Sequence, residues 1–244
     1  DGSPALGDAY LGGAWRTVLV SGMNAGAQGL FALDITDPSR FNETNAASVV
    51  KWETGSADAD VGYIFGRPII AKLRDGSWRA IVGNGYNSSN GVAVLLLVDL
   101  QSGVITKVST STGSAGTPNG LSGVAAVSRV DDGVIDYVYA GDLYGNLWKF
   151  DLTASAPGSW RVAYSASGSP APLFAAGSAQ PITARPDIAK FPQGGYLVAF
   201  GTGRYVDVTD NSTGGGQWLY GIWDNGTVVT SAQLQPQTIV TTAT

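Results

Sequence analysis

The sequence predicts an all-β fold, a β-propeller of about four blade-like units, and three observations support this prediction. The first is composition: 34 of the 244 residues are Gly, 10% are aromatic and only 14% are charged. Such a chain is typical of many short strands joined by turns. The second is local: Asp-Gly and Asn-Gly pairs separate apolar, β-branched runs, which indicates hairpins. No segment keeps helical spacing of apolar residues over about eleven positions, so we expect almost no helix.

The third observation is an internal repeat. Residues 15–22 resemble residues 78–85 at an offset of 63, and residues 67–72 return as 185–190 after 118 residues. Units therefore recur about every 60 residues, as expected for radially repeated four-stranded sheets. We predict one propeller domain or partial propeller over residues 1–244, with approximate units at 1–55, 56–115, 116–175 and 176–244.

Each unit is expected to contain four strands in the same order. An apolar first strand, as at 68–72, 124–127 and 186–190, is followed by a turn that contains Gly. The second strand is β-branched or aromatic and stops at a Gly, which we interpret as a site of close approach or positive φ. The third strand ends in a hydrophobic residue and an Asp. After a turn the fourth strand follows, as at 101–105 and 224–228.

Two residue types recur at equivalent places in the units. An Asp after a strand commonly accepts a hydrogen bond from the backbone two residues on, so we interpret these residues as turn formers. They are Asp34, Asp99, Asp151 and Asp224. The recurring tryptophans are expected to pack between blades, with stacking on a sugar or a quinone as the alternative. They are Trp15, Trp52, Trp78, Trp148, Trp160 and Trp223.

Charge and missing residue types exclude several functions. The chain has no His and no Cys, which excludes Ser-His-Asp and Cys-His catalysis and zinc sites built on these residues. The net charge is −5 and the 14 Lys and Arg residues form no basic stripe, so we expect no nucleic-acid partner. The longest apolar run, residues 92–98, has the length of a strand, so no membrane span is expected. No signal peptide is visible, so the chain is expected to be a mature product or a piece of a larger parent.

Five motifs resemble one known family, in the same order along the chain. They are residues 62–68 (GYIFGRP), 81–86 (IVGNGY), 136–152 (DYVYAGDLYGNLWKFDL), 200–205 (FGTGRY) and 220–224 (YGIWD). Together they cover nearly the whole sequence. The chain resembles the C-terminal β-propeller domain of the PilY/PilC type IV pilus tip adhesin and biogenesis family. This resemblance implies a modified, quinoprotein-like propeller with more than four blades, so we expect the chain to be part of a larger propeller.

This resemblance implies a function without catalysis. It implies roles in pilus biogenesis, in the control of retraction during twitching motility and in cell adhesion. The implied location is the cell surface or pilus tip, after export through the periplasm and outer membrane of a Gram-negative bacterium. The implied partners are pilus tip or minor pilin components and host or abiotic surfaces, contacted by a larger parent protein.

The resemblance also implies an EF-hand-like calcium loop, for which residues 128–136 are the candidate. The positions that correspond to ligands are Ser128, Val130, Asp132, the carbonyl of Val134, and Asp136. Calcium takes about six to eight oxygen ligands, many of them from carboxylates. Ser128 stands where the pattern has Asp, and Val130 has no side-chain oxygen, so two ligands are missing. A plain hairpin turn is an equally good interpretation of this loop.

We therefore expect calcium binding here to be weak or absent. The turn is expected to form without metal, with the Asp132 carboxylate accepting backbone N–H groups across Gly133. Two other functions remain open. A quinoprotein-like dehydrogenase would need a carboxylate base, but Glu43 and Glu53 are the only glutamates, so no quinone is expected. A carbohydrate-binding propeller is the other alternative.

Overall fold

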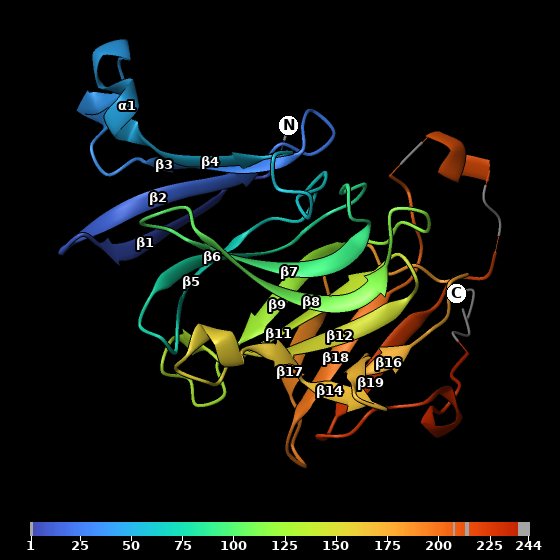
Figure 1. Ribbon diagram of the computed structural model, residues 1–244. Helices are drawn as coiled ribbons and strands as arrows, with labels where there is room; N and C mark the ends of the chain where they lie inside the picture. Colours follow the sequence, from blue (N-terminus) through green and yellow to red (C-terminus); the bar gives the residue numbers. More distant parts are fainter. Residues whose placement is uncertain (1, 207, 213–214, 239–244) are drawn as a thin grey trace, which may run out of the picture.

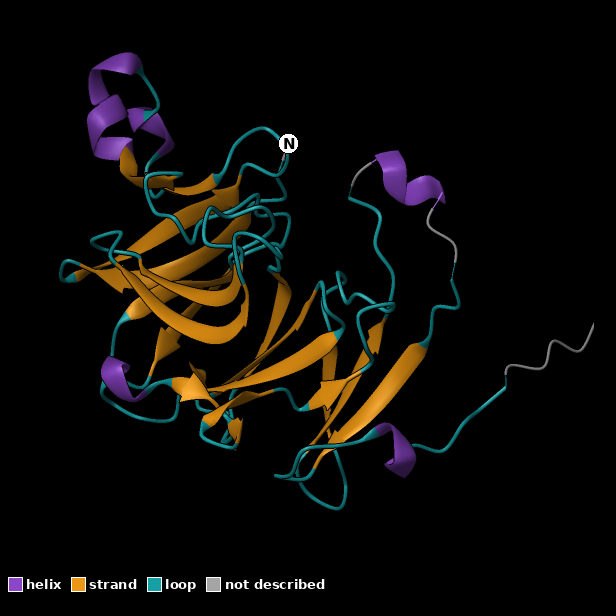
Figure 2. Cartoon of the chain, turned by 45° about the vertical axis from the view of Figure 1, so that its right-hand side comes forward, coloured by secondary structure: helices purple, strands orange, loops and turns teal. Residues whose placement is uncertain are grey.

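Strands dominate the structure, a computed structural model that describes residues 2–206, 208–212 and 215–238. They form four main sheets that follow one another from the N-terminal to the C-terminal end (Figure 1). Within the described ranges, helix is limited to the four-residue α1 (Ala46–Val49) and short 3-10 turns (Figure 2). None of the helices in this part of the chain has the length and apolar character to cross a membrane. The predicted all-β class is confirmed.

The first two sheets each have four antiparallel strands that pair in chain order. The first contains β1 (Ala5–Leu11), β2 (Ala14–Gly22), β3 (Gly29–Asp34) and β4 (Val50–Gly55), with η1 (Pro38–Arg40), η2 (Glu43–Asn45) and α1 inserted before β4. The second contains β5 (Ile69–Leu73), β6 (Trp78–Gly83), β7 (Val92–Asp99) and β8 (Ile105–Gly113). Residues 93–98 of β7 are buried, because this strand lies inside its sheet and has a neighbouring sheet on each face.

The third sheet departs from the simple pattern at its outer edge. Its strands are β9 (Leu121–Val127), β11 (Tyr137–Asp142) and β12 (Asn146–Asp151), and β12 pairs on its outer side with two short strands, β13 (Arg161–Val162) and β16 (Phe174–Ala175). Between them lie the hairpin β14 (Tyr164–Ala166) and β15 (Ser169–Ala171), and before them lies η3 (Pro157–Ser159). Two separate pieces therefore fill the place of the predicted fourth strand.

The fourth sheet has three strands, β17 (Asp187–Lys190), β18 (Tyr196–Gly201) and β19 (Leu219–Asp224). The turns η4 (Val208–Ser212) and η5 (Ser231–Gln233) lie outside it. The fourth strand predicted at 224–228 is not formed, so this prediction was wrong. The reason is a tertiary contact: the backbone N–H of Val229 donates to the carbonyl of Leu173 at 2.8 Å, which draws this segment toward the third sheet.

Each pair of neighbouring sheets shares an apolar core. One core lies between the first and second sheets, another between the second and third, and a further one between the third and fourth. Trp52, Trp148 and Trp160 are buried within them, as predicted. Trp15 is 62% exposed, but its ring meets that of Trp78 in the second sheet edge to face, with ring centres 5.8 Å apart, and Trp78 packs against the core between these two sheets. Trp223 is 39% exposed and packs on Phe191, which follows β17 in the same sheet, so the prediction of packing between blades was wrong for Trp223.

The glycines that end the second strands explain how closely the sheets approach. A Cβ atom added at Gly22 or Gly83 would lie 2.5 or 2.2 Å from a backbone oxygen of the following unit. One added at Gly141 would lie 2.2 Å from the side chain of Ile182. Close approach, the predicted reason for these glycines, is confirmed at these three positions. A Cβ added at Gly201 would meet nothing within 4 Å.

Candidate functional site

The candidate loop, residues 128–136, leaves the third sheet and reaches the second. It connects β9 to β11, and within it β10 (Val134–Ile135) pairs in parallel with β5. Val134 lies opposite Lys72 and Ile135 opposite Leu73. Because Arg74 follows directly after β5, this pairing brings its side chain to the loop.

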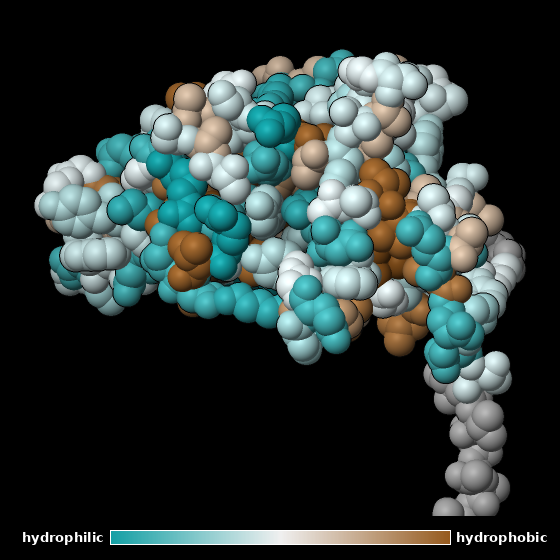
Figure 3. All heavy atoms as spheres, turned by 90° about the horizontal axis from the view of Figure 1, so that it is seen from below, coloured by the Kyte–Doolittle hydropathy of each residue, from teal (hydrophilic) through white to brown (hydrophobic). Residues whose placement is uncertain are grey.

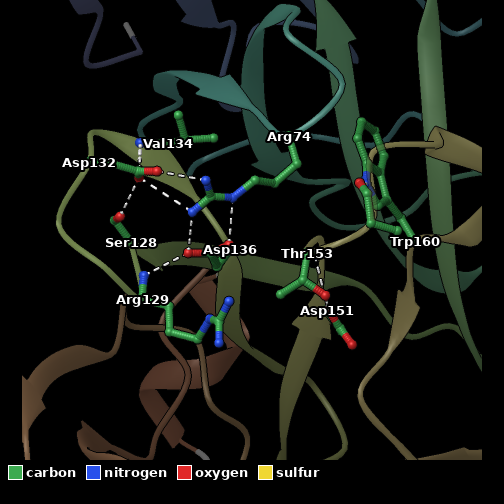
Figure 4. A network of polar contacts seen from close by, with 10 residues as sticks. Arg74, Ser128, Arg129, Asp132, Val134, Asp136, Asp151, Thr153 and Trp160 are labelled. Carbon is green, nitrogen blue, oxygen red and sulfur yellow. Dashed lines mark hydrogen bonds and ion pairs between the residues drawn. The ribbon is translucent and has the colours of Figure 1, made fainter.

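The guanidinium of Arg74 binds both carboxylates of the loop (Figure 4). It donates from Nε to Oδ1 of Asp136 at 2.7 Å and from Nη2 to Oδ2 at 2.8 Å, a two-pronged contact. It also donates from Nη1 to Oδ2 of Asp132 at 2.6 Å, with a longer contact of 3.3 Å from Nη2 to Oδ1. The planar fork of an arginine matches carboxylates in this way, whereas a lysine would not. We call this arrangement the arginine clasp: Arg74, Asp132 and Asp136.

Groups within the loop complete the clasp. The backbone N–H of Val134 donates to Oδ1 of Asp132 at 3.0 Å across Gly133, in the arrangement expected from the sequence. Gly133 has a φ of 77°, a left-handed conformation that favours glycine. The Ser128 hydroxyl donates to the same carboxylate oxygen at 3.0 Å, and the backbone N–H of Arg129 donates to Oδ2 of Asp136 at 2.7 Å.

These contacts keep the loop carboxylates ionised. The hydrogen bond from Arg74 is the main reason that the pKa of Asp132 falls to about 2. Burial raises the pKa of Asp136, but its hydrogen bonds from Arg74 and the Arg129 N–H outweigh burial and hold the pKa below its ordinary value. The same hydrogen bonds raise the pKa of Arg74.

The residues of the loop do not fit a calcium ion. Both carboxylates that fall in register hold the guanidinium, and the Ser128 hydroxyl is turned toward Asp132. Val130 offers no side-chain oxygen and is 59% exposed. Calcium would need about six to eight oxygens here. Across the described residues, no group of three or more His, Cys, Asp or Glu side chains is placed to hold a metal ion.

The loop also contacts the fourth sheet. Asp131, which has a φ of 55°, forms an ion pair with Lys190 of β17. Both side chains are more than half exposed, so solvent screens this pair. The loop therefore joins three successive sheets: the second through β10 and the clasp, the third by its chain connections, and the fourth through Lys190.

The prediction that an Asp ends each third strand as a turn former is confirmed. All four side chains accept a hydrogen bond from the backbone N–H two residues on, at 3.0–3.2 Å. They are Asp34, Asp99, Asp151 and Asp224. One of them has a second role that the sequence did not indicate.

Asp224 is the centre of a buried polar cluster between the third and fourth sheets. Its side chain is fully buried and receives Lys149 Nζ at 2.6 Å and the hydroxyls of Tyr139 and Tyr164 at 2.5 Å each. Burial by itself would raise the pKa of Asp224, but these donors together hold it below its ordinary value. The buried charge is thus paired and hydrogen-bonded, as its stability requires. We call this set the Asp224 cluster: Asp224, Lys149, Tyr139 and Tyr164.

The comparisons with known proteins agree on one family. Residues 1–241 match the family described as the PilY1 beta-propeller domain. A type IV pilus biogenesis factor PilY1 homolog of Xylella fastidiosa is 47% identical over 94% of this chain and 16% of its own length. The type IV pilus biogenesis factor PilY1 of Pseudomonas aeruginosa is 42% identical over 97% of this chain and 22% of its own length.

A solved structure supports the same assignment. The crystal structure of the Pseudomonas aeruginosa PilY1 C-terminal domain superposes with a TM-score of 0.81 at 42% identity. The match covers 94% of this chain and 51% of that one. The chain therefore spans about half of the solved domain and about a fifth of the curated relatives' length. With a fold of four packed sheets and matches over nearly its whole length, the chain belongs to the PilY1 β-propeller family.

Proposed function

We propose that this propeller acts in type IV pilus biogenesis, in the control of pilus retraction and in attachment to surfaces. Its location would be the cell surface or pilus tip, within a larger exported protein. The observation that carries the proposal is the family match over residues 1–241, together with relatives named as type IV pilus biogenesis factors. Its partners would be other pilus tip components or minor pilins, and host or abiotic surfaces.

The proposed role is structural and does not involve catalysis. Among the buried acids of the described residues, Asp224 is committed to Lys149 and two tyrosines and has a lowered pKa. A general base works best with a pKa near the operating pH, which usually requires a raised carboxylate pKa. The buried acid of the clasp, Asp136, is likewise held ionised by Arg74.

We also propose that the loop at 128–136 works without calcium, with Arg74 supplying the positive charge. The clasp carries this proposal. A guanidinium bound to two carboxylates at 2.6–2.8 Å leaves neither of them available for a metal without first being displaced. Because the Arg side chain is covalently part of the chain, its presence does not depend on the calcium concentration.

Calorimetric titration with Ca²⁺ tests the loop. The wild-type chain should give no binding heat at millimolar calcium. A triple variant, Ser128→Asp, Val130→Asp and Arg74→Gln, restores the two missing ligands and removes the guanidinium, and it should bind Ca²⁺. The matched control is the double variant that keeps Arg74, which should bind much more weakly. A micromolar wild-type site that disappears in Asp132→Ala would overturn the proposal.

The cellular role is tested by genetic complementation in the bacterium that encodes the protein. A strain that lacks the parent gene should lose surface pili or twitching, and a parent without residues 1–244 should fail to restore them at equal export. Full restoration by that truncated parent would contradict the proposal. A parent with the triple variant should keep assembly, but its twitching should vary with the calcium concentration, whereas twitching with the wild-type parent should not.

A further inference from the structure

A cavity between the third and fourth sheets combines positive charge with aromatic walls. It has a volume of about 450 Å³, within the roughly 300–1,000 Å³ range of small-molecule sites. Its lining includes Arg129, Tyr137, Lys149, Lys190, Tyr196 and Asp224. Neither the arginine clasp nor the family assignment accounts for this arrangement.

The floor of the cavity is electrically balanced. Lys149 and Asp224 form an ion pair at 2.6 Å, and each is at least nine-tenths buried. Lys149 Nζ also lies 4.2 Å from the centre of the Tyr137 ring, where a cation is attracted to the aromatic face. The pair fixes the position of the ring and leaves no uncompensated charge beneath it.

The rim, in contrast, has cations available to a ligand. The Arg129 side chain points away from Arg74 (Figure 4) and forms no hydrogen bond or ion pair with any described residue, although its backbone N–H holds Asp136. Lys190 is more than half exposed and, among the described residues, pairs with Asp131 in a contact that solvent screens. At the rim of this cavity, the Arg129 guanidinium is thus a cation without an ion-pair partner among the described residues, in a protein of net charge −5.

The walls supply the half-buried ring of Tyr137, the edge of Tyr196, which is 7% exposed, and two phenol hydroxyl groups. Tyr137 and Tyr196 meet edge to face, with ring centres 6.2 Å apart. Among the described residues, neither hydroxyl has a hydrogen-bond partner, in contrast to Tyr139 and Tyr164, whose hydroxyls bind Asp224. Phe191 adds a third ring to the lining. Tyrosine offers an apolar face together with a polar tip, which suits a ligand that has both C–H surface and hydroxyl groups.

From these groups we infer that the cavity binds an acidic saccharide, through one sugar ring that carries a carboxylate. The carboxylate binds the Arg129 guanidinium, which pairs well with such groups. The sugar ring packs on Tyr137 beside the edge of Tyr196, and its hydroxyls bond to the phenol groups of these two residues. The inference deepens the proposed attachment to surfaces, on which its biological meaning rests, by naming the chemistry of the surface.

The test is a calorimetric or NMR titration of the full 244-residue chain with trigalacturonate as the probe. The matched ligand is its methyl ester, which has the same sugar rings without the charge. The acid should bind at least about tenfold more tightly than the ester, as expected for the loss of a charge-assisted hydrogen bond. Equal affinity for the acid and the ester would overturn the inference. No detectable binding of the acid at a ligand concentration of about 10 mM would also overturn it.

Protein variants identify the site. Arg129→Gln should weaken binding at least about tenfold, and Tyr196→Phe should weaken it less because the ring remains. The control is Arg161→Gln, a surface arginine of the same unit that does not line this cavity, and it should bind as the wild type does. Unchanged affinity in Arg129→Gln, or equally tight binding of a tripeptide that contains Glu, would contradict an acidic-saccharide site.

The two proposals fail in different ways. Arg129→Gln in the parent protein should leave the number of surface pili unchanged and reduce attachment to a polygalacturonate-coated surface. A purified chain that does not bind the probe would end this inference while the piliation experiment still decides the pilus role. Normal piliation without residues 1–244 would end the assembly role while the titration still decides the cavity.

Discussion

The third and fourth sheets have related sequences but different surroundings. The third lies between two neighbours, and its Trp148 and Phe150 are at most 1% exposed. The described part of the fourth packs on the third through one face only. On its other face Leu219 is 77% exposed and Trp223 is 39% exposed. Apolar side chains are also visible at the surface in Figure 3, among mostly hydrophilic ones.

Residues at equivalent positions of the repeated units can therefore have different roles. Gly141 and Gly201 end equivalent strands, but only the first is needed to let a neighbour approach. Asp99 and Asp224 end equivalent third strands and form the same turn, but only the second also holds a buried lysine. The role of such a residue depends on which groups of the next sheet pack against it. The free energies of unfolding of matched variants at the two equivalent positions test this.

The largest effect is expected at the Asp224 cluster. Asp224→Asn keeps the shape of the side chain but leaves Lys149 buried without its counter-ion. Removing one partner of a buried pair typically lowers the free energy of unfolding by about 3–5 kcal/mol. Urea denaturation followed by tryptophan fluorescence measures the loss. Asp99→Asn, which affects the turn alone, should cost about 1 kcal/mol or less. Equal losses at the two positions would show that Asp224 is only a turn former.

The second-largest loss of stability is expected at Gly141, with Gly201 as the matched position. Gly141→Ala places a methyl group where Ile182 lies at 2.2 Å, so the sheets must move apart. Overpacking of this kind typically costs about 1–3 kcal/mol. Gly201→Ala meets no neighbour and should change the free energy of unfolding by less than about 0.5 kcal/mol. Thermal unfolding of both variants decides the matter, and a similar loss in each would mean that the open face is covered in solution.

The third effect depends on pH. The pKa of Asp224 in the folded state is lower than its ordinary value of 3.8, so folding favours the ionised form. Its contribution to stability is therefore complete above pH 3.8 and is lost as the pH falls toward its folded-state pKa. Asp132 acts in the same direction, with a folded-state pKa of about 2.

Melting temperatures recorded from about pH 6 down to about pH 3 measure this loss. Other carboxylates also titrate in this range, so the informative quantity is the difference between wild type and Asp224→Asn. That difference should shrink as the pH falls, because acid removes from the wild type the charge that the variant already lacks. A difference that stays constant with pH would argue against an ionised Asp224.

The smallest effect is expected on the open face of β19. Leu219→Ala removes a side chain that is 77% exposed and should change the free energy of unfolding by less than about 0.5 kcal/mol. Ile222→Val, in the same strand but fully buried, removes only one methylene and should still cost about 0.5–1.5 kcal/mol. The reverse order in a denaturation experiment would mean that the exposed side of β19 is the one packed in solution.

Features that depend on residues close together in the chain could be predicted from the sequence. Alternation of apolar residues and the turn signals predicted the first three strands of each unit. The turns at Asp34, Asp99 and Asp151 followed because an Asp side chain needs only a backbone N–H two residues away. The missing calcium ligands in the loop at 128–136 were also evident, because oxygen-bearing side chains can be counted along the chain.

Contacts between groups far apart in the chain could not be predicted in this way, because they depend on how the sheets pack. Arg74 and Asp136 are 62 positions apart, and Tyr139 and Asp224 are 85 apart, so no local pattern connects them. The parallel pairing of β10 with β5 and the packing of the third sheet on the fourth bring these groups together. The same cause removed the predicted strand after Asp224, because Val229 found a backbone partner at Leu173. A buried charge or backbone N–H group pairs with a group that lies close to it in the folded chain. Which group that is depends on how the sheets pack and not on distance along the sequence.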